Sequence, residues 1–314
     1  MSSDAGVVPP DRFLCGWRLR TRIAMPELAP WAGDDREPDL RIHTGAIPPR
    51  LDDAQDVSPL LQVNAERQAR LSIDDVATYW LRTAHEIVID PQSDVDSPDV
   101  RTFLFGTILG LLCHRRNLFP LHASCVVVAG KAIAISGVSG AGKSTLAAAL
   151  VRRGHRLVSD DICAIDAGAP GGPVVRPAFP RAKLWQDSLE AMGVAASGLQ
   201  ANRFGQNKYY LRFSDPAEFQ MEPVRLQTVY LLDQRAAPIA GREEIERLTV
   251  THAAVGVHDQ VYRKRTALCW GRAADLFAAV GQIVGAAEIY RLTRGPDLAD
   301  LDRLVRRIEA HAAT

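Results

Sequence analysis

The segment from Gly137 to Ser144 reads Gly-Val-Ser-Gly-Ala-Gly-Lys-Ser and satisfies the whole G-x-x-x-x-G-K-[ST] pattern of a phosphate-binding loop. Its glycines let the main chain wrap closely around phosphate groups, and successive backbone amides supply oriented hydrogen-bond donors. Lys143 would neutralise β- and γ-phosphate oxygens, and Ser144 would ligate Mg²⁺. The pattern predicts binding of a nucleoside triphosphate, most simply MgATP, through the following residues: Gly137, Val138, Ser139, Gly140, Ala141, Gly142, Lys143, Ser144 and Thr145.

Two adjacent carboxylates, Asp160 and Asp161, follow Ser144 by 16 and 17 residues. They end a predicted strand at residues 156–158, which precedes a second hairpin across residues 168–173, so we expect both to face the phosphate loop. Adjacent side chains diverge at a strand end, so one carboxylate could address the metal while the other takes a proton from an incoming hydroxyl. The alternative is that the pair merely opens a turn.

His122 and a group of cationic residues are weaker candidates. A lone histidine before a hairpin is more often structural, so His122 needs support from outside the residues themselves. Cationic side chains after the aspartates could stabilise charge on a transferring phosphoryl group; they are Arg176, Arg181, Lys183, Arg203, Lys208 and Arg212. The chain has no G-x-S-x-G, no H-E-x-x-H and no glycine loop of the eukaryotic protein-kinase type.

A strand and a helix must hold the loop. Residues 124–128 and 132–136 are two β-compatible runs, and the three residues between them allow only a hairpin. The second run leads directly into the loop. Residues 143–153 are rich in alanine and leucine without a breaker, and Gly154 stands where a helix ends. The loop is therefore predicted between a strand and a helix, as its chemistry requires.

The remainder of the chain divides into two predicted domains. Residues 13–90 alternate apolar and polar residues with a period of two, which predicts a small antiparallel β module. Ser97 followed by Pro98 predicts the start of a helix. We assign residues 1–96 to a β-rich amino-terminal module that could dock substrate, and residues 97–314 to a catalytic domain. Further predicted elements are strands at 224–232 and 287–292 and helices at 248–263, 273–284 and 298–310.

Charge gives no reason to expect nucleic acid or a membrane surface as partner. Lys plus Arg and Asp plus Glu both number 37, so there is no net field to attract polyanions. Arg18, Arg20 and Arg22 alternate with apolar residues in one predicted strand; this is typical of a solvated strand face, with a binding surface as the alternative.

Length and composition are those of a globular protein, with 314 residues, 47% of them apolar and 24% charged. The longest apolar stretch, residues 103–113, is too short to span a bilayer. Five dispersed cysteines without a C-x-x-C pair argue against disulfides and a zinc site; they are Cys15, Cys113, Cys125, Cys163 and Cys269. We expect a soluble cytoplasmic protein.

Three segments together resemble the carboxy-terminal catalytic domain of HPr kinase/phosphorylase. They are His122-Ala-Ser, the phosphate loop, and the run from Arg153 through Gly-His-Arg-Leu-Val-Ser to the two aspartates. The resemblance implies an α/β fold with α+β character, namely a P-loop core with a mixed sheet related to phosphoenolpyruvate carboxykinases. It further implies that Lys143 binds phosphate, Ser144 and Asp161 hold Mg²⁺, Asp160 is the base toward a serine hydroxyl and His122 supports that base.

The chain departs from that family at several points. Thr145 stands where the family usually has glutamate, and the second family signature, associated with the reverse reaction, is not found. Residues 180–185, 252–263 and 289–294 look more like shorter relatives, among them kinases of lasso-peptide pathways that phosphorylate a precursor peptide. The leading hypothesis is thus an ATP-dependent serine kinase that transfers the γ-phosphoryl group to a hydroxyl of a peptide or small protein, such as a lasso-type precursor. The family resemblance also implies homo-oligomers. The alternatives are a carbohydrate-regulatory HPr kinase, a non-catalytic ATP-binding sensor or scaffold, and a small-molecule kinase.

Overall fold

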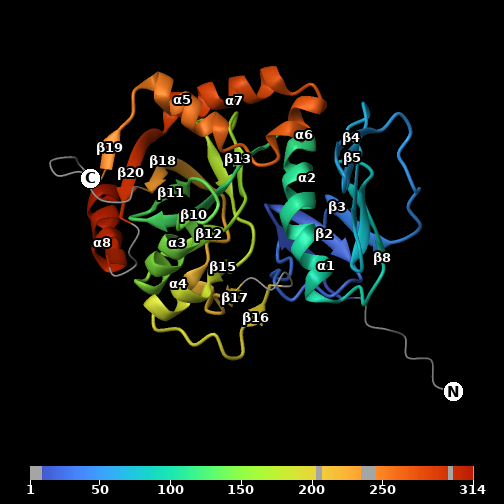
Figure 1. Cartoon of the computed structure of the whole chain (residues 1–314), viewed down its shortest axis with the longest axis horizontal. Helices are drawn as coiled ribbons and strands as arrows, with labels where there is room; N and C mark the ends of the chain where they lie inside the picture. Colours follow the sequence, from blue (N-terminus) through green and yellow to red (C-terminus); the bar gives the residue numbers. More distant parts are fainter. Residues whose placement is uncertain (1–8, 203–206, 235–244, 296–299, 314) are drawn as a thin grey trace. The chain divides into compact units, whose positions relative to one another are not determined.

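The computed structural model describes residues 9–202, 207–234, 245–295 and 300–313 (Figure 1). The chain separates into two compact units, Met1–Arg115 and Arg116–Thr314. The sequence placed the boundary between residues 96 and 97, whereas the units divide after Arg115. The helical segment beyond residue 97 packs into the first unit, where the Tyr79 hydroxyl donates to the Val100 carbonyl at 2.9 Å.

The described part of the first unit holds a sheet of eight strands in the order β1-β2-β3-β8-β7-β6-β5-β4. Their bounds are β1 (Arg12–Leu14), β2 (Trp17–Thr21), β3 (Leu40–Thr44), β4 (Gln55–Ser58), β5 (Leu61–Val63), β6 (Ala69–Ile73), β7 (Ala77–Leu81) and β8 (Glu86–Pro91). The β-rich character is confirmed, but the prediction of a purely antiparallel module is wrong, because β3 pairs in parallel with both β2 and β8. Alternation of side chains is the same in both kinds of pairing, so the pattern could not distinguish them.

The helical segment of the first unit begins where the sequence predicted. Ser97 caps α1 (Pro98–Phe103) by accepting from the Val100 amide at 3.4 Å, and Pro98 occupies the first turn. The segment continues through a π-helical turn, η1 (Leu104–Ile108), into α2 (Leu109–Arg115).

The second unit contains a larger sheet and a small one. In its described residues, nine strands form a mixed sheet in the order β12-β10-β11-β18-β14-β13-β9, with β20 beside β18 and β19 beside β20. A separate three-stranded sheet has the order β15-β17-β16. The strands are β9 (Phe119–Leu121), β10 (Ala123–Val128), β11 (Lys131–Ser136), β12 (Arg156–Ser159), β13 (Cys163–Asp166), β14 (Val174–Arg176), β15 (Arg181–Trp185), β16 (Gln200–Ala201), β17 (Lys208–Arg212), β18 (Val224–Gln234), β19 (Ile245–Arg247) and β20 (Glu288–Arg294).

Helices cover both faces of the larger sheet (Figure 1). They are α3 (Lys143–Arg152), α4 (Gln186–Ala191), α5 (Val250–Asp259), α6 (Lys264–Cys269), α7 (Ala273–Ala286) and α8 (Leu301–Ala312), with one 3₁₀ turn, η2 (Pro216–Glu218). Val126 of β10 packs in one core with residues of α3 and α8, while Val127 packs in a second core with residues of α5 and α7. Both faces of β10 are therefore buried, which explains why its sequence is a continuous apolar run.

The local predictions around the phosphate loop are confirmed. β10 and β11 form the expected antiparallel hairpin. α3 ends at Arg152, and Gly154 follows at φ 94°, the left-handed conformation that terminates many helices. β13 and β14 form the second hairpin. The α/β architecture with a mixed sheet and a β-rich amino-terminal part is thus confirmed.

Elements farther along the chain differ in detail. The predicted helix at 248–263 is shorter in the structure, where α5 spans Val250–Asp259. Arg263, at a left-handed φ of 54°, is the N-cap of the separate helix α6. The sheet β15-β17-β16 was not predicted. Residues 298 and 299, the start of the last predicted helix, lie outside the described residues. The five cysteines are free thiols. Among the helices described, none is long and apolar enough to cross a membrane.

Candidate functional site

The phosphate loop joins β11 to α3, as the sequence predicted. Gly137 adopts φ 152° and Gly142 φ 103°, a conformation that glycine tolerates best. A β-carbon on Gly137 would lie 3.0 Å from the Leu232 β-carbon, and one on Gly142 would lie 3.2 Å from the Arg294 side chain. Arg294 Nε also donates to the Ala141 carbonyl at 2.7 Å. The loop is therefore packed closely on neighbouring residues, and a side chain at either glycine would displace its neighbour and strain the backbone.

Lys143 begins α3, and its side chain turns back over the loop. Its ammonium donates to the carbonyl of Gly137 at 2.9 Å and to that of Val138 at 3.2 Å. The side chain is buried, and this burial lowers the pKa of Lys143, while Asp161 and Asp160 act in the opposite direction. A partly dehydrated cation held against the loop is well placed to bind phosphate oxygens.

Asp160 follows the last residue of β12 and is 6% exposed. Its Oδ1 accepts from the Ser124 hydroxyl at 2.5 Å, and its Oδ2 accepts from the Lys183 backbone amide at 2.8 Å. Burial raises the pKa of Asp160, whereas hydrogen bonds from Ser124, Lys183 and the Ser144 hydroxyl lower it. The carboxylate is thus fixed beside the metal-binding hydroxyl that the loop motif predicts.

Asp161 has a different environment. Its backbone is left-handed, with φ 69°, and its side chain is 47% exposed. His122 Nδ1 lies 3.0 Å from the Asp161 carbonyl oxygen and 3.4 Å from its Oδ1. Because a carbonyl oxygen can only accept, Nδ1 carries the proton in this contact. The His122 backbone is itself held, since its amide donates to the Gln260 carbonyl at 2.8 Å.

These residues surround one pocket with a volume of about 150 Å³. It is lined by His122, Ser139, Gly140, Gly142, Lys143, Ser144, Thr145, Asp160, Asp161, Lys183, Trp185 and Lys208. The structure therefore gathers His122, both aspartates and most of the predicted loop residues. Of the other loop residues, Val138 is 65% exposed and Ala141 is buried in the core.

The cationic residues named from the sequence separate into different positions. Lys183 and Lys208 line the pocket. Arg176 instead pairs with Asp166 at 2.8 Å. Arg181 is buried, with its guanidinium 4.2 Å from the centroid of a tyrosine ring in β17. Arg203 lies outside the described residues.

Sequence reasoning missed Trp185 as a pocket residue. A usable signal was present, because Lys183 and Trp185 alternate with the apolar Ala182 and Leu184, which is the period of a half-buried strand. Ala182 and Leu184 face the core, so Lys183 and Trp185 face the other way.

The donor set fits Mg²⁺ bound together with nucleotide phosphates. Within the described ranges, no group of three or more His, Cys, Asp or Glu side chains is placed to hold a metal alone. In phosphate-loop proteins, however, the ion is held by a hydroxyl, a carboxylate and the phosphates themselves. Ser144 and the two aspartates offer these hard oxygen ligands at the edge of the loop.

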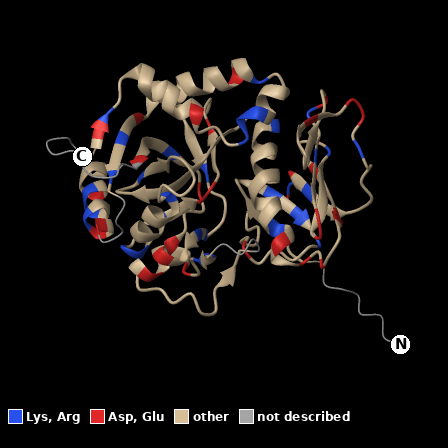
Figure 2. Cartoon of the chain, viewed as in Figure 1, with Lys and Arg blue, Asp and Glu red and all other residues tan. Residues whose placement is uncertain are grey.

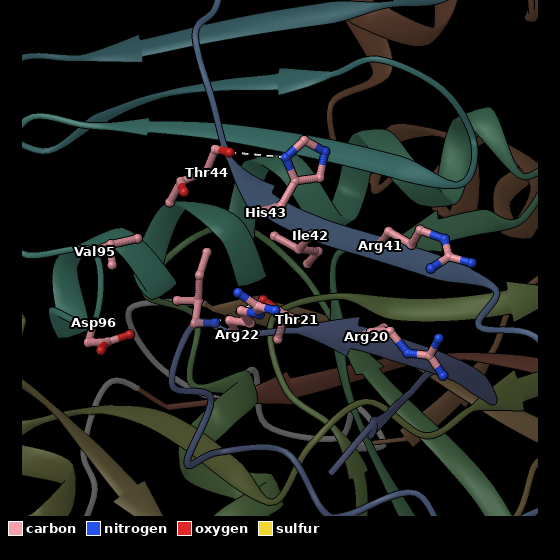
Figure 3. A pocket seen from close by; sticks show the side chains of 10 residues that line it. Arg20, Thr21, Arg22, Arg41, Ile42, His43, Thr44, Val95 and Asp96 are labelled. Carbon is pink, nitrogen blue, oxygen red and sulfur yellow. Dashed lines mark hydrogen bonds between the residues drawn. The ribbon is translucent and has the colours of Figure 1, made fainter. Parts of the chain in front are cut away.

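The first unit has a pocket of its own, with a volume of about 580 Å³ (Figure 3). It is lined by Arg20, Thr21, Arg22, Ile23, Arg41, Ile42, His43, Thr44, Val95 and Asp96. Arg20 and Arg41 are neighbours across β2 and β3, and they pair with Asp11 at 3.0 Å and Glu37 at 2.8 Å. Basic and acidic residues are likewise interspersed in both units, in keeping with the zero net charge (Figure 2).

Comparison with known proteins supplies independent information on the segment around the loop. Residues 116–175 match the family described as HPr Serine kinase C-terminal domain. A protein of Oceanobacillus iheyensis whose name assigns it to the HPr kinase/phosphorylases is 54% identical over 50 residues, which are 15% of this chain and 16% of that protein. The HPr kinase/phosphorylase of Bordetella pertussis is 40% identical over 74 residues, 24% of this chain and 23% of the relative.

These alignments span less than a quarter of either curated relative. A structure of the Hpr(Ser) kinase/phosphatase from Coxiella burnetii aligns with 62% of this chain and 92% of that chain, at 12% identity and a TM-score of 0.33. The family match covers the segment that holds His122, the loop and the aspartates. The resemblance to the HPr kinase/phosphorylase C-terminal domain is therefore confirmed over residues 116–175.

Proposed function

We propose that this protein is an ATP-dependent kinase that transfers the γ-phosphoryl group to a serine hydroxyl of a peptide or small protein. One observation carries the proposal: a single pocket joins the loop lysine, the loop serine, two aspartates and a histidine. Phosphoryl transfer needs little covalent chemistry from the protein, so positioning and charge stabilisation supply most of the catalysis. The match of the same segment to a kinase family supports this activity over simple nucleotide binding.

The roles of the two aspartates can be argued from their contacts. The resemblance implied that Asp160 is the base and Asp161 a metal ligand. The contacts support the reverse assignment: Asp160 is buried beside Ser144, whereas Asp161 is half exposed and touches His122. We infer that Ser144 and Asp160 would hold Mg²⁺, which would neutralise negative charge on the nucleotide phosphates when bound. Asp161, oriented by His122, then accepts the proton of the incoming hydroxyl.

Transfer of label from γ-labelled ATP tests the activity. The purified protein is incubated with Mg²⁺ and a panel of HPr, serine-bearing precursor peptides and buffer alone. Label should appear on one acceptor and disappear with Asp161→Asn, while Asp166→Asn serves as a control because Asp166 pairs with Arg176 outside the pocket. ATP binding without label on any acceptor would contradict the kinase proposal and favour a sensor or scaffold.

The acceptor is proposed from two sources. The segments at 180–185, 252–263 and 289–294 resemble kinases of lasso-peptide pathways, which supports a serine of a precursor peptide. The alternative acceptor is HPr, and the names of the matched relatives favour it. Both acceptors are in the panel, so the same experiment distinguishes them.

We further propose that the first unit docks the acceptor through the pocket of Figure 3. In support, Arg22 lines this pocket, is exposed, and makes no hydrogen bond or ion pair with the described residues. Arg22→Glu should raise the KM for the peptide and leave the affinity for ATP unchanged. An unchanged KM would refute this docking site.

A further inference from the structure

Two lysines and a tryptophan enter the pocket from the small sheet. β15 and β17 pair antiparallel, with Lys183 opposite Tyr210 and Trp185 opposite Lys208. Lys183 and Trp185 are two residues apart on β15, so they lie on one face of the strand pair together with their partners. That face borders the pocket, whereas the opposite face packs in the core.

Three ammonium groups meet in the pocket. Lys143 comes from the loop, and Lys183 and Lys208 come from the strand pair. Burial is the main cause that lowers the pKa of each of them. They also repel one another, since Lys208 lowers the pKa of Lys143 and Lys183 lowers that of Lys208. Such mutual repulsion is relieved when an anion binds among the three groups.

Asp161 raises the pKa of both strand lysines by charge attraction, but no carboxylate among the described residues makes an ion pair with either ammonium. The Lys208 ammonium lies 4.0 Å from the centroid of the Trp185 ring, a cation–π contact. The Lys183 backbone amide donates to Asp160 Oδ2, which fixes β15 against the metal-binding edge of the pocket. Neither ammonium makes a hydrogen bond or an ion pair with a side chain in the described part of the chain, so both are available to a ligand.

We propose that Lys183 and Lys208 bind the oxygens of the transferring phosphoryl group, and that Trp185 positions Lys208 for this contact. The proposal rests on the kinase function above and names the cations that complete its site. Lys143 belongs to the phosphate loop and would neutralise the phosphates of ATP, whereas Lys183 and Lys208 line the same pocket from β15 and β17. The transferring phosphoryl group would thus be contacted by cations from three elements, α3, β15 and β17, which would stabilise its negative charge.

The serine oxygen forms a bond to the γ-phosphorus while the bond from that phosphorus to the β,γ-bridging oxygen breaks. The bridging oxygen keeps the electron pair and leaves as part of ADP. The serine proton passes to the Asp161 carboxylate. Negative charge on the three non-bridging oxygens persists throughout, and Lys183 and Lys208 stabilise it without gaining or losing a proton.

Glutamine and arginine variants of both lysines test the catalytic role. Lys183→Gln and Lys208→Gln should each lower kcat by about 10²-fold and change the affinity for MgADP less than twofold, because ADP lacks the transferring group. Arginine at either position should restore part of the rate. Lys131→Gln is the matched control, since Lys131 lies at the hairpin turn of β11 outside the pocket. An unchanged kcat in both glutamine variants would overturn the proposal, as would an equal loss of MgADP affinity.

A binding readout separates this proposal from the kinase function. ADP with aluminium fluoride and Mg²⁺ mimics the transferring group and needs no acceptor. The wild-type protein should bind this complex more tightly than MgADP, and the glutamine variants should lose that advantage. If the wild type phosphorylates no acceptor but shows the advantage, and the glutamine variants lose it, the choice of function fails and the lysine assignment holds. If the variants keep the whole advantage, the lysine assignment fails.

Trp185 is tested through its coupling to Lys208. Trp185→Ala should lower kcat in the wild-type background. It should have little further effect in Lys208→Gln, because the ammonium that the Trp185 ring positions is then absent. Trp185→Phe keeps an aromatic face and should restore most of the rate. Equal losses from Trp185→Ala in both backgrounds would show that the ring acts independently of Lys208 and would refute its positioning role.

Discussion

Ser124→Ala probes the carboxylate that we assign to the metal. Ser124 is fully buried and donates to Asp160 Oδ1 at 2.5 Å, so it stabilises the ionised carboxylate in a site where burial raises the pKa of Asp160. A hydrogen bond to a charged group contributes about 1.5–3 kcal/mol. Alanine removes it and raises the pKa of Asp160 further. Because only the ionised form binds Mg²⁺, kcat/KM on the acidic side of the profile should fall about 10- to 100-fold.

The assay is the initial rate of transfer between pH 5 and 9 at several Mg²⁺ concentrations. Mg²⁺ competes with the proton for Asp160, so high Mg²⁺ should restore the acidic side of the variant's profile toward that of the wild type. Ser188→Ala is the control: its buried hydroxyl bonds Thr145 at 2.8 Å instead of a carboxylate, and its profile should keep its position. Coincident profiles for wild type and Ser124→Ala would refute the reasoning. A displaced profile that Mg²⁺ leaves unchanged would argue that Asp160 is the base.

Three further outcomes follow from packing and charge. Gly137→Ala places a β-carbon in a close contact at positive φ and should lower the free energy of unfolding by about 1–3 kcal/mol, measured by urea denaturation. The control is Gly281→Ala, in open space on α7, which should raise the free energy of unfolding by about 0.5–1 kcal/mol. Burial raises the pKa of Asp160, so its ionisation lowers the stability of the folded protein as pH rises through that pKa. Asp160→Asn should therefore have a higher melting temperature than the wild type at neutral pH. This difference in melting temperature should vanish below pH 3.8, the ordinary pKa of the group. Arg101→Met leaves Glu27 charged and buried without its 2.9 Å partner and should cost about 3–5 kcal/mol, measured by denaturation of the full chain.

Local sequence patterns predicted the loop and its supports well. The hairpin before the loop, α3 and the hairpin after the aspartates depend on contacts between residues close in sequence, which spacing and glycine positions reveal. The parallel pairing of β3 depends instead on partners far along the chain, and alternation carries no information about strand direction.

The features of the site that the sequence did not predict also depend on contacts between residues far apart in the chain. His122 and Asp161 are 39 residues apart, and their contact depends on the pairing of β9 with β13 and of β10 with β12. Six cations followed the aspartates, yet the choice of Lys183 and Lys208 needed the register of β15 and β17. The roles assigned to these residues stay predictions that the experiments above address.

Asp161 occupies a backbone conformation, φ 69°, in which a side chain costs about 1 kcal/mol relative to glycine. Folding alone would therefore favour replacement of this aspartate, and only a benefit from its carboxylate opposes the change. A library of variants at this position sorted for abundance should become enriched in glycine and asparagine, whereas the same library sorted for phosphorylation should return aspartate. The two selections would rank one set of residues in opposite orders, and the size of that inversion measures how much stability this protein gives up for its chemistry.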